Sequence, residues 1–263
     1  MEKTLWKHIQ TVRTQSPLVH NITNFVVMNN TANALLAVGA SPIMAHAHAE
    51  VQDITRICQA LVINIGTLDQ YWVQSMLLGA QQAQKLNKPW ALDPVGAGAT
   101  PYRDSSLSEL LSYKPTVIRG NASEILALAR ANTTPTKGVD STAESNEAID
   151  AAQQIATEYD TLVCISGKTD IIVSKDKRIY LNNGHALMTR VTGLGCSATA
   201  VIGAFIAVIE DKTEALTAAM ALFSICGELA AKKAKGPGTL QVLLLDKLFN
   251  ITEKEFLQTI KLS

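Results

Sequence analysis

The chain has 263 residues, a length within reach of one α/β domain. Hydrophobic residues make up 47% of it and charged residues 17%, which excludes a disordered or fibrous protein and leaves apolar surface for an oligomer to cover. Its 23 basic and 23 acidic residues cancel, so charge gives no reason to expect nucleic acid or an acidic membrane as partner.

Short apolar runs alternate with helical patterns through the first two thirds of the chain. The apolar runs predict buried strands at residues 61–65, 89–93, 116–119 and 161–166. The segments between them have the length of crossover helices, at residues 68–86, 104–112, 122–131 and 147–159. Continuous apolar strands separated by helices are typical of a parallel sheet with helices on both faces.

The last third of the chain changes character. Residues 171–174 and 178–181 flank a short charged turn and predict an antiparallel hairpin. From residue 195 the pattern is helical almost to the end, and apolar stripes at 26–38 and 218–229 predict core or interface helices. We therefore expect a helical C-terminal third.

No part of the sequence marks a second domain. The most polar stretch, residues 132–147, predicts a surface excursion, and the uncharged stretch at 191–209 contains three glycines and predicts a buried core helix rather than a membrane span. We expect a single domain over residues 1–263, with a three-layer α/β fold and a mostly parallel central sheet flanked by helices.

The cysteines point to a reducing compartment. None lies in a C-x-x-C pair, and the first residues lack the long apolar stretch of a secretory signal. We expect reduced thiols in a cytoplasmic protein. The four cysteines are Cys58, Cys164, Cys196 and Cys226.

Polar side chains follow the predicted strands. In open parallel sheets, ligands bind where the strands end. Here Asp93 and Glu124 supply carboxylates, Arg119 supplies a cation, residues 94–98 form a glycine-rich turn, and Ser166 ends the fourth strand. Either carboxylate alone could be a helix cap or a solvated charge. Together they favour a phosphate-bearing ligand with a divalent cation, because Mg²⁺ takes one or two carboxylates plus phosphate oxygens.

A second signal is the glycine-containing turn at residues 192–197, which leads into a helix. Gly193 and Gly195 there leave backbone N–H groups exposed at a helix start, which predicts an anion site, although a tight turn into a buried helix has the same pattern. The spacing of Gly193, Gly195 and Ala198 also fits a dinucleotide fingerprint, but the strand–helix–strand unit which that motif requires is missing.

Other motifs are incomplete. Residues 166–169 resemble the end of a Walker A loop, but Leu162 stands where that loop needs glycine, and a strand follows instead of a helix. His46 and His48 have strand-like spacing, yet no third zinc ligand is evident. These histidines and Lys168 receive no role.

Cys196 stands at a helix start, where the pKa of a thiol tends to fall. A cysteine hydrolase, with His185 as the partner base, is therefore one alternative.

Several blocks together resemble the hydroxyethylthiazole kinases of thiamine salvage, a family of the ribokinase-like superfamily. They follow in that family's order and span nearly the whole chain. The blocks are residues 17–24 (PLVHNITN) with 33–45 (NALLAVGASPIMA), 93–100 (DPVGAGAT), 117–125 (VIRGNASEI), 191–196 (VTGLGC) and 236–239 (GPGT).

The resemblance implies an activity and an assembly. The family uses ATP and Mg²⁺ to phosphorylate the primary alcohol of 4-methyl-5-(2-hydroxyethyl)thiazole. It also implies a homotrimer with the thiazole sites at subunit interfaces, which would use the surplus apolar surface.

The resemblance further implies residue roles. Met44 and Gly193, with Asn24 as a weaker candidate, would contact the thiazole, and Arg119 and Ser166 would bind the ATP phosphates.

For the reaction itself, the resemblance implies that Asp93 and Glu124 hold Mg²⁺ through water and that the turn of Gly193, Gly195 and Cys196 stabilises the phosphoryl group in transfer. Most sugar kinases of the superfamily have aspartate at the position of Cys196, where it accepts the alcohol proton. A thiol must first ionise to do the same. Positioning and charge neutralisation dominate phosphoryl transfer, so we expect the thiol to matter less than Arg119 or the turn.

Three alternatives stay open at this point. A kinase for a related vitamin precursor, such as a hydroxymethylpyrimidine or pyridoxal, would share the fold, but residues 17–24 and 41–45 match thiazole kinases. A dinucleotide-dependent oxidoreductase would depend on the turn at Gly193. A catalytically silent binding module would not require Asp93, Arg119 and Glu124 together.

Overall fold

The computed structural model describes the backbone of residues 1–131 and 141–263, and the side chains of residues 1–130 and 146–263. Its sheet has eight strands in the order β2-β1-β3-β4-β5-β6-β7-β8. Neighbouring strands from β2 to β6 pair in parallel, and β7 and β8 form an antiparallel hairpin beside β6. The strands are β1 Leu18–Ile22, β2 Ser41–Ile43, β3 Ala60–Asn64, β4 Trp90–Asp93, β5 Val117–Asn121, β6 Leu162–Ser166, β7 Asp170–Val173 and β8 Arg178–Leu181.

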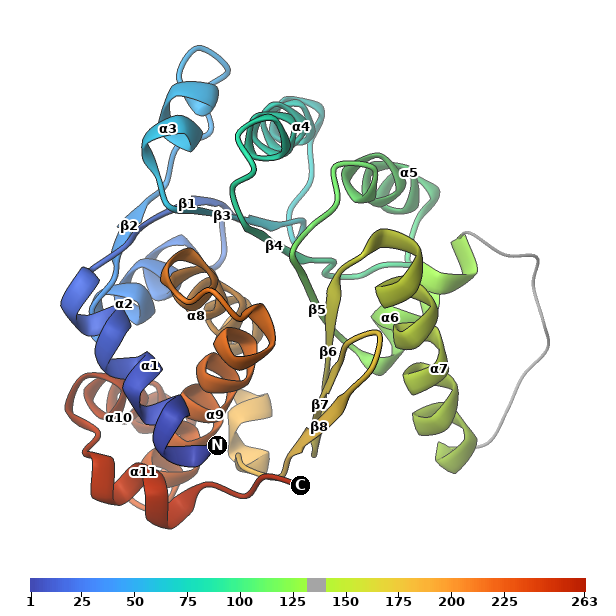
Figure 1. Ribbon diagram of the computed structural model, residues 1–263. Coiled ribbons are helices and arrows are strands. Elements are labelled where there is room, and N and C mark those ends of the chain that lie inside the picture. Colours follow the sequence, from blue (N-terminus) through green and yellow to red (C-terminus); the bar gives the residue numbers. More distant parts are fainter. Residues whose placement is uncertain (132–140) are drawn as a thin grey trace.

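Helices cover both faces of this sheet (Figure 1). On one face lie α3 Val51–Ile57, α4 Gln70–Lys85, α5 Pro101–Leu111, α6 Ala122–Ala131 and α7 Ser141–Tyr159. On the other lie α1 Glu2–Gln15, α2 Met28–Val38, α8 Leu194–Val208, α9 Lys212–Ala231, α10 Pro237–Asn250 and α11 Glu253–Thr259, with the short 3₁₀ helix η1 Ala186–Arg190 before α8. The expected three-layer α/β fold with a helical C-terminal third is confirmed.

The apolar strands explain the two helical layers. Successive side chains of a strand point to opposite faces, so a strand that is covered on both sides must be apolar throughout. In β3, Leu61 and Ile63 are buried in the core under α3 to α7, while Ala60 and Val62 are buried in the core on the side of α8.

The six predicted strands are confirmed, with ends that differ by at most two residues, and so is the hairpin of β7 and β8. Strands β1 and β2 had not been predicted. β1 contains the buried polar residues His20 and Asn21, and β2 has only three residues with Pro42 in the middle, so neither has the apolar pattern of a core strand. His20 is buried without charge, since burial lowers its pKa to about 4.

The expectation for residues 132–147 needs a correction. Residues 132–140 lie outside the described part of the chain, but α7 begins at Ser141 rather than at residue 147. Residues 141–147 are almost all polar or charged, so their sequence resembles that of a loop, although they form the beginning of α7.

Helix α8 lies against the middle of the sheet and is buried along nearly its whole length. It packs on β1, β3 and β4 and also contacts α1, α2 and α9. Helix α9 is long and apolar enough to cross a membrane, but 89% of its apolar window is buried inside the protein. Both are core helices, as the sequence predicted for the stretches around 191–209 and 218–229.

Gly203 allows α8 to approach the sheet. A methyl group at this position would overlap Val62 of β3 and lie 3.1 Å from Val19 of β1. Both neighbours are β-branched and stiff, so they cannot easily move aside. The small residue therefore sets the distance between α8 and the strands.

We predict that Gly203→Ala lowers the free energy of unfolding by about 1–2 kcal/mol, because overpacking outweighs the better helix propensity of alanine. Gly238→Ala in α10 is the matched control, since nothing lies within 4 Å of the added methyl group. Denaturant titration of both variants measures the difference. Equal stability of the two variants would contradict this tight packing.

Candidate active site

The carboxyl ends of the parallel strands meet the first turn of α8 at one edge of the sheet. Asn24 follows β1, Asn64 ends β3, Asp93 ends β4 and Arg119 lies in β5. Cys196 lies in the first turn of α8. Parallel strands must end at the same edge, so residues far apart in the sequence come together here.

A chain of hydrogen bonds joins Cys196 to Asp93. The Nδ2 of Asn24 lies 3.7 Å from the Sγ of Cys196 and donates to the Oδ1 of Asn64 at 2.7 Å. The Nδ2 of Asn64 donates to the Oδ2 of Asp93 at 2.7 Å, and the hydroxyl of Thr199 donates to the same oxygen at 3.0 Å. The network orients one carboxylate from two sides.

Asp93 is almost fully buried. Burial raises the pKa of its carboxyl to about 6, although Arg119 and the hydrogen bonds from Thr199 and Asn64 lower it, and the nearby Glu124 raises it further. A buried carboxylate that is only partly neutralised by its neighbours is a favourable place for a cation.

Cys196 differs from the sequence expectation. Burial and the negative charge of Asp93 raise the pKa of its thiol to about 11, in spite of its place at a helix start and of Asn64, Asn24 and Arg119, which lower it. The thiol is therefore protonated at neutral pH. Among the four cysteines it is half-buried, whereas the other three are buried.

Arg119 lies against the start of α8. A methyl group on Gly195 would come 3.1 Å from its Nη1, so the guanidinium covers the first turn of that helix. Burial lowers the pKa of Arg119, but Asp93, Cys164 and Asp170 raise it by more, and the group stays charged. Its Nε is buried without a hydrogen-bond partner among the described residues. The site thus contains an unsatisfied donor and a positive charge suited to an anion.

Gly193 makes the turn before α8 possible. It has a φ of +79°, a left-handed conformation, and a methyl group there would lie 2.6 Å from the Cγ1 of Val27. The turn directs the first backbone N–H groups of α8, beginning with Leu194, toward the site edge. The anion site at this turn stays a prediction, which the left-handed conformation of Gly193 at the start of the helix supports.

Glu124 has both carboxylate oxygens on backbone donors. Its Oε1 accepts from the N–H of Gly96 at 3.0 Å, and its Oε2 accepts from the N–H of Asn121 at 2.8 Å. It therefore ties the loop after β4 to the end of β5. Each oxygen keeps further acceptor capacity for a water molecule.

A cavity of about 820 Å³ opens beside Arg119. It lies between the ends of β5 to β8 and the first turns of α8. Its volume is in the size range of small-molecule sites. Ser166, at the end of β6, lines it and donates its hydroxyl to the carbonyl of Gly120 at 3.3 Å. Lys168 and His185 line it as well, and the Nδ1 of His185 accepts from the N–H of Leu187.

The N-terminal candidates lie farther along the same edge. Met44 follows β2, the edge strand beyond β1, and is half-buried. The ring of His46 packs on Trp72, and that of His48 stacks on Tyr71 with centroids 3.7 Å apart. Among the described residues, no group of three potential metal-binding side chains of His, Cys, Asp or Glu occurs.

Three residues of the site had not been singled out. Thr199 stands one turn after Cys196, so its helical spacing could have indicated it. Asp170 begins β7 and accepts from the N–H of Gly167 and the hydroxyl of Ser224, and Arg103 donates to the carbonyls of residues 65, 66 and 95. These last two act through contacts that the sequence pattern does not reveal.

Known proteins resemble this chain over nearly its whole length. Residues 9–254 match the family described as the hydroxyethylthiazole kinase family. A hydroxyethylthiazole kinase of Syntrophus aciditrophicus is 51% identical over 258 residues, 98% of this chain and 96% of that protein.

Solved structures agree with this result. A hydroxyethylthiazole kinase of Pyrococcus horikoshii superposes with a TM-score of 0.92 at 43% identity, over 99% of this chain and 98% of that one. A ribokinase-like superfamily protein of Enterococcus faecalis, 14% identical, superposes with a TM-score of 0.64 over 88% of this chain and 86% of its own, which supports the fold alone. The chain belongs to the hydroxyethylthiazole kinase family and has a ribokinase-like fold.

Proposed function

We propose that this chain is a single kinase domain that transfers the γ-phosphoryl group of ATP to the primary alcohol of 4-methyl-5-(2-hydroxyethyl)thiazole. The observation that carries the proposal is the meeting of Asp93, Arg119 and the start of α8 at one sheet edge, in a chain of this family.

We further propose a cytoplasmic location, which its four free cysteines support and cell fractionation tests.

We propose that the thiazole binds near Cys196, against Asn24, Gly193 and Met44. Asn24 supports this proposal because its amide reaches both Cys196 and Asn64 and is itself buried. Gly193 supports it because it lies at the start of α8, three residues before Cys196. The alcohol oxygen would then lie near the first backbone N–H groups of α8.

We propose that ATP occupies the cavity of about 820 Å³, with its phosphates on Arg119 and Ser166. The unsatisfied Nε and the charge of Arg119 support this assignment. The N–H groups around Gly195 lie next to the guanidinium, so both can stabilise the charge of the group in transfer.

The residues also fit a magnesium ion. Mg²⁺ prefers oxygen ligands and keeps several of its waters, and Asp93 at the end of β4 and Glu124 in the first turn of α6 offer carboxylate oxygens. Asn64 and Thr199 hold the Asp93 carboxylate in one orientation, and two backbone N–H groups do so for Glu124. When bound through water, the ion would neutralise phosphate charge.

In the reaction, the alcohol oxygen forms a bond to the γ-phosphorus while the bond to ADP breaks, and the proton of the alcohol passes to an oxygen of the transferred phosphoryl group or to water. Cys196 is a poor acceptor for that proton, because its pKa of about 11 keeps the thiol protonated. We propose that the thiol mainly positions the hydroxyl and that Arg119 and the α8 turn provide most of the stabilisation.

The activity can be tested by ADP release with ATP, Mg²⁺ and one of three alcohols. We expect turnover with 4-methyl-5-(2-hydroxyethyl)thiazole, none with hydroxymethylpyrimidine or pyridoxal, and loss of turnover when EDTA replaces Mg²⁺. Turnover only on another alcohol would contradict the substrate assignment. No turnover by protein that binds ATP would support a silent binding module instead.

We predict that Cys196→Ala lowers kcat by less than about tenfold, whereas Arg119→Ala lowers it by roughly a hundredfold or more, because charge stabilisation dominates phosphoryl transfer. Single-turnover kinetics at saturating substrates measure both. Cys196→Asp introduces a group that accepts a proton readily, so it should keep or raise the activity.

The outcome that would overturn this ordering is an inactive Cys196→Ala variant that still binds ATP, since the thiol would then be an essential base. An inactive Cys196→Asp variant that binds both substrates would count against any proton transfer at this position.

We propose a homotrimer with sites at subunit interfaces. Apolar side chains beside the site and on the adjacent helices α2 and α10 support it: Phe25 is 59% exposed, Val26 61%, Leu36 58%, Val242 61% and Phe249 72%. Such exposure is large for side chains of this type.

We predict that sedimentation gives about three times the chain mass of 28.2 kDa and that Val242→Asp dissociates the assembly and reduces activity. Ile57→Asp, on α3 across the sheet and equally exposed, is the matched control and should leave the mass unchanged. A fully active monomer would contradict the proposal.

A further inference from the structure

One wall of the cavity is a connecting segment. Asn182, Asn183, Gly184 and His185 follow β8, and the residues of η1 continue the wall. This segment lies beyond the end of β8, three strand spacings from Arg119 in β5, or roughly 14 Å at about 4.8 Å per spacing. If phosphates lie on Arg119, the segment is placed to face the nucleoside end of ATP.

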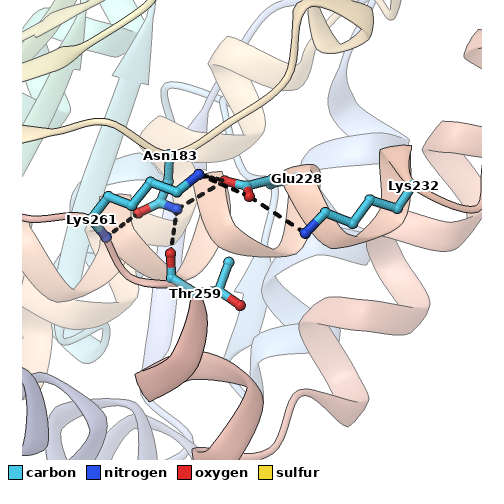
Figure 2. A network of polar contacts seen from close by, with 5 residues as sticks. All are labelled: Asn183, Glu228, Lys232, Thr259 and Lys261. Atoms are coloured by element: carbon cyan, nitrogen blue, oxygen red, sulfur yellow. Dashed lines mark hydrogen bonds and ion pairs between the residues drawn. The ribbon is translucent and has the colours of Figure 1, made fainter.

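A network of polar contacts fixes this segment to α9 and to the end of α11 and the residues after it (Figure 2). The Nδ2 of Asn183 donates to the Oε2 of Glu228 at 2.9 Å and to the carbonyl of Thr259 at 2.8 Å, and its Oδ1 accepts from the backbone N–H of Lys261 at 2.8 Å. Asn183 is only 4% exposed, so these bonds satisfy a buried amide and fix its position.

Glu228 is the centre of the network. The Nζ of Lys261 lies 3.0 Å from both of its carboxylate oxygens, and Lys232 lies 3.6 Å from one of them. Glu228 thereby joins α9 to the segment after α11 and to the cavity wall. The carboxylate is nearly buried, so its hydrogen bond to the buried amide of Asn183 is stronger than one at the surface.

Residues 261–263 complete the arrangement. They run beside β8 as a further edge, with Ser263 and Tyr180 exchanging backbone hydrogen bonds of 2.8 and 3.0 Å and the N–H of Asn182 donating to the carbonyl of Lys261 at 2.9 Å. The wall is therefore held both through its backbone and through the side chain of Asn183.

One face of α9 supports the cavity at three successive points. Ser224, Gly227 and Glu228 have the i, i+3, i+4 spacing of a helix face. Ser224 donates to Asp170 at 3.0 Å, the bare backbone of Gly227 accommodates Met188 of η1, and Glu228 holds Asn183. Asp170, Met188 and Asn183 all line the cavity.

We propose that Glu228 and Lys261 are positioning residues for the nucleotide: they fix the segment of residues 182–185 against the cavity and so set its affinity for ATP. The proposal rests on the assignment of this cavity to ATP. Neither residue touches the reacting atoms, and Lys261 acts from a part of the chain outside the family's glycine-containing motifs.

We predict that Glu228→Gln and Lys261→Met raise KM for ATP by about three- to tenfold, the loss of one charged hydrogen bond, while kcat and KM for the thiazole stay within twofold. Lys261→Arg should restore most of the affinity. Lys247→Met is the matched control, because it breaks a similar ion pair of 2.9 Å to Glu255 between α10 and α11, and it should leave KM for ATP unchanged.

The result that would overturn the proposal is an unchanged KM for ATP in Lys261→Met, or a fall in kcat alone. An equal effect of Lys247→Met would show a general loss of stability instead. Lys261 is exposed over 54% of its side chain, so its variants should fold even where Glu228→Gln does not.

Isothermal titration with ADP separates this proposal from the assignment of the cavity. If Arg119→Ala and Ser166→Ala weaken ADP binding but Lys261→Met does not, only the positioning role fails. If none of them weakens it, the nucleotide binds elsewhere and the assignment of the cavity itself fails.

Discussion

The close contact between α8 and the sheet is the constraint on which the site depends. Gly203 permits that contact, because any larger residue would meet Val62 and Val19. Once α8 is held there, its first turn must lie over the ends of β3, β4 and β5. Gly193 then supplies the left-handed turn through which the chain enters the first turn of α8. Packing in the core thus determines where the backbone N–H groups of the site lie.

That placement brings opposite charges into a buried environment. Asp93 and Asp170 have raised pKa values because burial opposes their charged forms, and Arg119 lies close enough to lower both. Among the described residues, Arg119 forms no direct salt bridge with either aspartate, and its Nε has no hydrogen-bond partner. A charged substrate with its cation would complete the hydrogen bonding and the charge balance. Under the proposed function, binding would thus offset part of the cost of burying these groups.

Much of the fold follows from local patterns. The runs at β3, β4 and β6 are apolar throughout because both faces of the sheet are covered, and this pattern is visible without any tertiary information. β1 and β2 escaped prediction for the opposite reason. His20 is polar yet buried, with hydrogen bonds from its ring to Thr55 and the carbonyl of Ala45, and such partners are invisible in a local pattern.

The sequence by itself determined the class of fold, the place of Asp93 at a strand end and of Arg119 in the next strand, and the glycine-containing turn before α8, since each depends on residues that are neighbours along the chain. Only the tertiary structure decided how they interact. Thr199 reaches Asp93 across 106 positions and Asn24 reaches Cys196 across 172. Burial raised the thiol pKa of Cys196 although its place at a helix start favours the thiolate. Contacts of this kind and the dielectric around a group are properties of the packed chain, so no local pattern contains them.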